Sequence, residues 1–109
     1  MYETKRRTKK IKGVSVETWN RDIVDANLLS VEAGTNGYQG GDTGHGSRTY
    51  LKIMDEGGTD INARVITDRL GYTEGIEIAL GGDSELSTFI EALKFATKVL
   101  EDQVQEASL

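Results

Sequence analysis

The chain has 109 residues, a net charge of −5, no cysteine and no proline. This length suits one domain with a modest core, and the lack of cysteine excludes disulfides and thiolate metal sites. No apolar run is long enough to span a membrane, and the first residues lack the apolar stretch of a secretory signal. We therefore expect a cytoplasmic protein.

Charge is distributed unevenly along the sequence. Residues 1–12 carry six basic residues and one acidic residue, whereas residues 13–109 carry seven basic and seventeen acidic residues. An acidic body lacks the basic face that duplex nucleic acid requires, which excludes duplex binding. We expect residues 1–12 to form a basic N-terminal arm or a first strand, and residues 13–109 to form a single α+β domain.

Alternating apolar residues predict an antiparallel sheet of about four to five strands. Residues 11–25 also fit a helix in part, and we favour a strand that ends at the turn-forming residues 20–22. Short connections favour antiparallel hairpins among the strands that follow. These strands are predicted over residues 27–35, 48–55, 60–67 and 75–80. Ile61, Ala63 and Val65 are in phase along the strand at residues 60–67. In the strand at residues 75–80, the residues expected on the buried face are Ile76, Ile78 and Leu80.

The C-terminal residues predict one long helix. Asp83 or Ser84 can cap its start, and apolar residues then recur every three or four positions over roughly 20 residues. We expect this apolar stripe to pack on one face of the sheet, which makes the fold class α+β. The stripe comprises Leu86, Phe89, Ile90, Leu93, Ala96, Leu100 and Val104.

One helix covers only one face of such a sheet. The alternation along residues 48–55 places Tyr50 and Met54 on the other face. A second copy of the chain would bury this surface, so we expect a homodimer or a higher homo-oligomer.

The run from Gly34 to Arg48 holds six of the thirteen glycines and the only histidine. Glycine allows a ligand to approach the main chain closely, and exposed amides with an arginine suit phosphate. The run is therefore a phosphate cradle or a long hairpin loop, and its polar side chains favour binding. The predicted ligand-binding residues are Asn36, Tyr38, Gln39, Gly41, Asp42, Gly44, His45, Gly46 and Arg48.

Catalytic sets are incomplete in this sequence. Asp42, His45 and Ser47 lie within one loop and lack a nucleophile elbow, and a lone histidine without cysteine is a poor zinc site. The phosphate-binding fingerprints of nucleotide enzymes are absent. We expect a protein that is not an enzyme and that has no metal or cofactor. The helix start at Gly82 and Asp83 is a second candidate phosphate site.

The motif GTNGY at residues 34–38, with GGDTGHGSRT at residues 40–49, resembles the first described type of phage Thoeris anti-defence protein. The strand that ends at Asp55 and the turn at residues 58–60 extend this resemblance, which runs from Asn27 to the C-terminal helix. It implies a sheet-and-helix oligomer built from dimers, which acts as a sponge for a cyclic ADP-ribose isomer and does not cleave it. It also implies cyclic oligonucleotides as ligands at a separate site.

Two other functions remain open at the level of sequence. One is a nucleotide or cyclic-dinucleotide phosphodiesterase that uses Asp42 and His45. The other is a protein-binding inhibitor whose acidic surface mimics nucleic acid.

Overall fold

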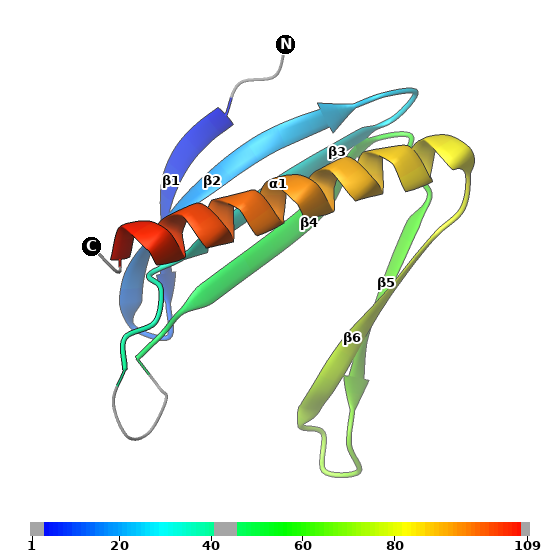
Figure 1. Cartoon of the computed structure of the whole chain (residues 1–109). Coiled ribbons are helices and arrows are strands. Elements are labelled where there is room, and N and C mark those ends of the chain that lie inside the picture. Colours follow the sequence, from blue (N-terminus) through cyan, green and yellow to red (C-terminus); the bar gives the residue numbers. More distant parts are fainter. Residues whose placement is uncertain (1–3, 41–45, 108–109) are drawn as a thin grey trace.

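The computed structural model describes residues 4–40 and 46–107. Within these residues, six strands precede one long helix, and the predicted α+β class is confirmed (Figure 1). The elements are β1 (Thr4–Ile11), β2 (Val14–Val24), β3 (Leu28–Thr35), β4 (Thr49–Gly57), β5 (Ile61–Thr67), β6 (Thr73–Leu80) and α1 (Asp83–Ala107).

The strands form two separate antiparallel groups. Strands β1 to β4 make a sheet in the order β1-β2-β3-β4, and β5 and β6 pair only with each other. The sequence pattern predicted a single sheet for all strands. The chain leaves that sheet after β4 because Asp55 Oδ1 accepts bonds from the amides of Gly57 and Thr59, at 2.9 and 3.1 Å, and Gly58 takes a positive φ of 73°.

The N-terminal hairpin differs from the prediction at residues 20–22. These residues do not form a turn, since β2 continues to Val24. Asn20 is satisfied inside the sheet, where its Nδ2 donates to Ser30 Oγ at 2.9 Å and to the Val31 carbonyl at 3.1 Å. The basic segment forms strand β1, joined to β2 by Lys12 and Gly13, both with the positive φ that a two-residue hairpin turn favours.

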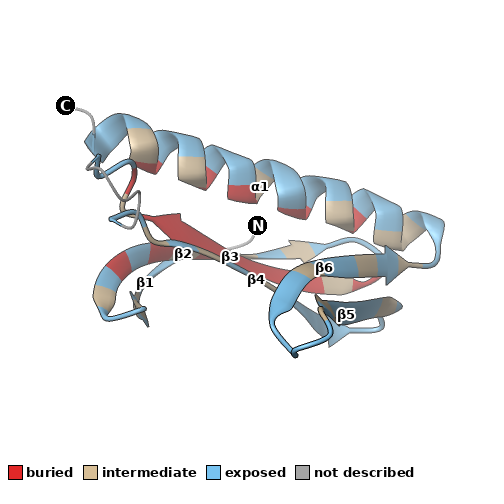
Figure 2. Cartoon of the chain, turned by 90° about the horizontal axis from the view of Figure 1, so that it is seen from below, coloured by how far each residue is buried: buried red, intermediate tan, exposed pale blue. Residues whose placement is uncertain are grey.

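Helix α1 packs across β3 and β2 through small side chains (Figure 2). Val31 and Ala33 of β3 meet three residues of α1 in the core, which are Ala92, Ala96 and Val99. The predicted stripe is therefore wrong in its orientation, since Leu86, Ile90 and Leu93 are exposed and Ala96 alone of that stripe is buried. The face of α1 with the smaller side chains packs on the sheet because it lets the helix approach the sheet more closely. The buried residues of α1 are Thr88, Ala92, Ala96, Val99 and Gln103.

The sheet curls on the face away from α1. Lys9 of β1 lies 5.5 Å from the ring centroid of Tyr50 of β4, although these are the two edge strands. The curl covers the Glu32 carboxylate, which accepts a bond from Thr18 Oγ1 at 2.6 Å and lies 3.6 Å from Arg7 Nη1. Tyr50, predicted to be uncovered, is consequently half-buried within a single copy.

Gly34 is required where the curl brings β2 and β3 together. A Cβ at this position would lie 2.3 Å from the Glu17 carbonyl oxygen and 2.6 Å from Thr18 Cγ2. We predict that Gly34→Ala lowers the free energy of unfolding by about 1–3 kcal/mol, the range for overpacking a closed site. Urea unfolding monitored by circular dichroism measures this change.

Gly57→Ala is the matched control in the same sheet, because its added Cβ would have Leu28 Cβ as nearest atom, at 4.0 Å. Equal stability of the two variants would contradict the close approach at Gly34.

Candidate functional site

The two ends of the glycine-rich run are held together by Asn36. The backbone amide of Asn36 donates to the Arg48 carbonyl at 3.2 Å, and the side-chain Oδ1 of Asn36 accepts from the Arg48 backbone amide at 2.7 Å. Its Nδ2 donates to the Gly46 carbonyl at 3.3 Å, and Gln39 Nε2 donates to the Asn36 carbonyl at 2.7 Å. The side chains of Asn36 and Gln39 therefore brace the loop, which gives these two predicted ligand residues a structural role.

The remaining predicted residues fall into two groups. Gly41, Asp42, Gly44 and His45 lie outside the described residues. Gly46 belongs to the brace, since a Cβ there would lie 2.5 Å from Gln39 Cβ. Tyr38 and Arg48 are the two predicted side chains whose surroundings bear on a ligand.

Tyr38 stands at the edge of a small hollow between the base of the loop and the end of α1. Tyr38 is 81% exposed, and the hollow has a volume of about 190 Å³. This volume suits a single base or ribose better than a whole dinucleotide. Its lining residues are Thr35, Gly37, Tyr38, Ser47, Thr49, Leu100 and Val104.

The Arg48 guanidinium is directed away from this hollow. Its guanidinium donates to the Ser47 carbonyl at 3.2 Å and to the Lys12 carbonyl at 3.4 Å, at the turn between β1 and β2. Arg48 is not among the lining residues of the hollow beside Tyr38.

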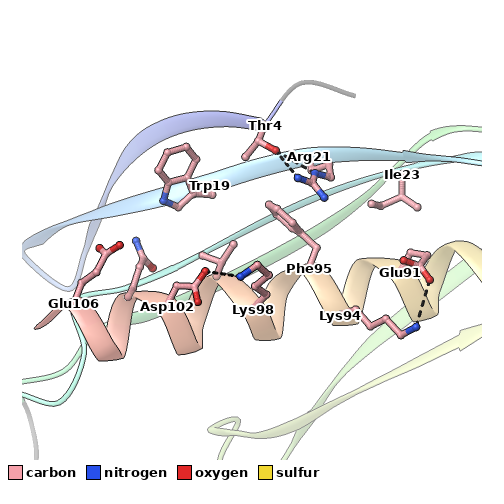
Figure 3. A pocket seen from close by; sticks show the side chains of 12 residues that line it. Thr4, Trp19, Arg21, Ile23, Glu91, Lys94, Phe95, Lys98, Asp102 and Glu106 are labelled. Atoms are coloured by element: carbon pink, nitrogen blue, oxygen red, sulfur yellow. Dashed lines mark hydrogen bonds and ion pairs between the residues drawn. The ribbon is translucent and has the colours of Figure 1, made fainter. Parts of the chain in front are cut away.

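A larger groove lies on the opposite flank of α1, between the helix and strands β1 and β2 (Figure 3). Its volume is about 410 Å³, and Trp19 and Phe95 supply its aromatic walls. The charged side chains around it are Arg21, Glu91, Lys94, Lys98, Asp102 and Glu106.

This groove was not predicted from the sequence, because the first long strand was expected to end at a turn formed by residues 20–22. Trp19, Arg21 and Ile23 alternate along β2 and share the face under the helix. That alternation is the signal that could have identified them.

Arg21 is held in a fixed position in the groove. Its guanidinium carbon lies 4.6 Å from the Phe95 ring centroid, and its Nε and Nη2 donate to Thr4 Oγ1 at 3.1 and 2.9 Å. A guanidinium stacked in this way keeps donors free for a second partner, because it carries five N–H groups. Arg21 is therefore preorganised to receive an anion.

The lysines of the groove are paired with carboxylates of their own helix. Lys94 Nζ lies 3.6 Å from Glu91, and Lys98 Nζ lies 3.0 Å from Asp102. Exposed pairs of this kind contribute about 0.3–0.5 kcal/mol. A phosphate can therefore recruit either lysine at small cost.

Gln103 connects the groove to the glycine-rich run. Its Oε1 accepts from the Thr35 amide at 2.8 Å, and its Nε2 donates to the Glu17 carbonyl at 2.9 Å. Gln103 also lines the groove, while Thr35 lines the hollow beside Tyr38. The two concave surfaces thus lie on either side of one anchored helix segment.

The helix start, the second candidate phosphate site, is occupied by a side chain of the protein itself. The Glu85 carboxylate accepts a bond from the Asp60 amide at 3.3 Å, and a Cβ on Gly82 would lie 2.2 Å from its Oε1. The pKa of Glu85 is lowered, first by its own backbone amide; burial opposes this shift as the next largest effect, and the Asp60 amide and the Asn27 side chain lower the pKa further. An external phosphate would have to displace this carboxylate.

Comparisons with protein families, with curated proteins and with solved structures found no match for this chain. Among residues 4–40 and 46–107, no group of three or more histidine or acidic side chains is placed to bind a metal ion. In the same residues, α1 is too polar to cross a membrane.

The brace at Asn36 leads to a prediction about the glycine-rich run. In Asn36→Ala the Arg48 amide loses its acceptor, Oδ1. A hydrogen bond of this kind contributes about 1 kcal/mol, so we expect hydrogen exchange at the Arg48 amide to accelerate roughly five- to tenfold. Ser47→Ala, which removes no bond of the brace, is the control. Unchanged exchange in Asn36→Ala would show that the loop is held by other contacts.

Proposed function

We propose that this chain is a phage-type anti-defence sponge that binds a cyclic ADP-ribose-type signalling nucleotide in the bacterial cytoplasm and does not cleave it. The observation that carries the proposal is the groove between α1 and β2, where aromatic walls meet a preorganised arginine. The resemblance of residues 34–49 to Thoeris anti-defence proteins supplies the class of ligand.

The groove offers the three chemistries that such a ligand requires. An adenine ring can stack on Trp19 or Phe95. Arg21, with Lys94 and Lys98 beside it, suits the pyrophosphate. The volume of about 410 Å³ lies within the usual range for small-molecule sites.

The glycine-rich run adds a second contact surface in this proposal. Tyr38 and the hollow beside it can hold the part of the ligand that extends past Gln103. Amides of the run can donate to a phosphate or ribose oxygen. The two surfaces are coupled through Gln103, which bonds both strands that carry them.

In this proposal the carboxylates of the groove bind the ligand. Glu91 and Asp102 form ion pairs with lysines on the same helix. When those lysines turn to the pyrophosphate, the two carboxylates can accept hydrogen bonds from ribose hydroxyls.

The sponge proposal predicts that the ligand survives binding. Purified protein mixed with a cyclic ADP-ribose isomer should show a raised melting temperature, since a ligand that binds only the folded state stabilises it. Heating the complex should then release the isomer unchanged, as measured by mass spectrometry. Recovery of a linear product would overturn the sponge and favour the phosphodiesterase that uses Asp42 and His45.

The position of the phosphate site is tested by two arginine variants. We predict that Arg21→Gln weakens binding by roughly 2–3 kcal/mol, the range for losing a charged hydrogen-bond donor. Titration calorimetry measures the change. Arg64→Gln is the control, because Arg64 lies on the β5–β6 hairpin in an exposed ion pair with Glu77.

The variant Arg48→Ala distinguishes a phosphate site in the groove from one in the glycine-rich run. Arg48 is the arginine of the predicted phosphate cradle, so a loss of binding confined to Arg48→Ala would place the phosphate site in the glycine-rich run. A loss confined to Arg21→Gln supports the groove, and losses in both variants support a ligand that spans the two surfaces.

A further inference from the structure

Asn36 and Gly37 form the only Asn-Gly pair of the chain. In such a pair the backbone nitrogen of the glycine can attack the carboxamide carbon of the asparagine, because glycine has no Cβ to hinder the approach. The attack closes a succinimide ring and releases ammonia, and asparagine is among the thermolabile residues of proteins. The reactivity of this pair in the folded chain depends on how its two reacting groups are held.

The attacking atom, the backbone nitrogen of Gly37, is engaged with Thr35. Its N–H donates to Thr35 Oγ1 at 3.1 Å, which is a local bond of the kind that threonine forms in turns. Both Thr35 and Gly37 are buried. Since the nitrogen must lose its proton before it attacks, the bond to Thr35 and the burial of Gly37 both oppose the reaction.

The carboxamide of Asn36, which is the group attacked, is turned across the glycine-rich run. Its Oδ1 accepts from the Arg48 backbone amide at 2.7 Å, and its Nδ2 donates to the Gly46 carbonyl at 3.3 Å. Rotation of the carboxamide toward the nitrogen of Gly37 would break both bonds. The bonds that brace the run therefore also restrain the reacting carbon.

The end of α1 covers this pair (Figure 1). A Cβ on Gly37 would lie 2.8 Å from Ala107 Cβ and 3.6 Å from Val104 Cα. The same part of the helix holds Thr35, whose backbone amide donates to Gln103 Oε1 at 2.8 Å. The docking of the helix end and the position of the Thr35 hydroxyl are thus linked, and release of this end would uncover the nitrogen of Gly37.

We propose that Asn36–Gly37 is a masked deamidation site, which is unreactive while the end of α1 is docked and reacts when that end is released. The Thr35 hydroxyl is the mask, and Gln103 holds Thr35 in place. Chains whose helix end has opened are then marked by a covalent change that closing of the helix does not reverse. The proposal does not depend on the identity of any ligand.

The reaction balances with water as the only co-reactant. The Gly37 nitrogen gives up its proton and forms a bond to Asn36 Cγ, while the Cγ–Nδ2 bond breaks and the departing nitrogen takes up a proton and leaves as ammonia. Water then opens the succinimide at either of its carbonyl groups, which leaves aspartate or isoaspartate at position 36. No group is oxidised or reduced.

Neither product can rebuild the brace. An aspartate at position 36 has no N–H to donate to the Gly46 carbonyl, and its carboxylate would face that oxygen. An isoaspartate lengthens the main chain beside Gly37, where a single added carbon would already meet Ala107. Deamidation would therefore keep the glycine-rich run open.

Peptide mapping of the full chain by mass spectrometry tests the proposal. Folded chain and chain unfolded in guanidinium chloride are incubated at mildly alkaline pH, and loss of the Asn36 carboxamide is followed. We expect this loss to be roughly a hundredfold slower in the folded chain, because three hydrogen bonds that each contribute a factor of about five must open first. Equal rates in the two states would overturn the proposal.

Two threonine variants locate the mask. Thr35→Val removes the acceptor of the Gly37 amide, so we expect Asn36 to deamidate roughly fivefold faster in a chain with an unchanged circular dichroism spectrum. Thr49→Val is the matched control, because it removes the hydroxyl that lies 3.0 Å from Thr35 Oγ1 and leaves Thr35 itself in place. Equal deamidation rates in the two variants would contradict a mask at Thr35.

The role of the helix end is tested by two glutamine variants. Gln103→Ala leaves the reacting pair and the Thr35 hydroxyl intact but removes both hydrogen bonds of the Gln103 side chain. We expect it to accelerate deamidation of Asn36 roughly five- to tenfold. Gln105→Ala, at an exposed position two residues further along α1, should deamidate at the wild-type rate. A wild-type rate in Gln103→Ala would show that docking of the helix does not control the site.

Discussion

The arrangement of this protein depends on how closely α1 lies on β3. Ala92 and Ala96 face Val31 and Ala33, and Gln103 replaces the apolar contact at the helix end with two hydrogen bonds to the sheet. A buried amide that satisfies both its donor and its acceptor fixes position more sharply than apolar contact alone. Small residues along one stripe and a bonded glutamine at its end therefore fix the rotation of the helix about its axis.

That rotation determines what each flank of α1 can do. The flank toward β2 carries Phe95 and the lysines, and together with Trp19 and Arg21 it forms the groove. The flank toward β4 carries the leucines that remain exposed. A helix turned so that these leucines faced the sheet would bury them and leave Phe95 in a different place. The groove of the proposed ligand site and the exposed leucines on the other flank thus have one common origin.

Much of the secondary structure follows from local sequence. The four later strands and the helix start at Asp83 agree with prediction to within two residues, since alternation, glycine turns and caps are local signals. Which surface packs on a given strand or helix face depends on residues far apart in the sequence. Alternation places Val65 and Ile76 on one face of their hairpin, but the expectation that Ile76 lies on a buried face is not met, since Ile76 is 64% exposed. Likewise, two neighbouring stripes of α1 are apolar, and the sequence cannot show which one allows closer packing.

The candidate site was predictable only in part, for the same reason. The glycine-rich run is conspicuous in the sequence, yet the roles of Asn36 and Gln39 as braces depend on contacts across the loop. The groove joins β1, β2 and α1, which are far apart along the chain, so no single motif marks it. Trp19 and Arg21 become candidates only once β2 is known to continue past Asn20.

Trp19 is the only tryptophan of the chain and lines the groove, so its fluorescence is the most direct test of the central claim. Titration with a cyclic ADP-ribose isomer should change the Trp19 emission in a saturable way, and Arg21→Gln should shift that change to higher ligand concentration. Binding of the isomer, shown by calorimetry, with no change in Trp19 emission would contradict a ligand site in the groove.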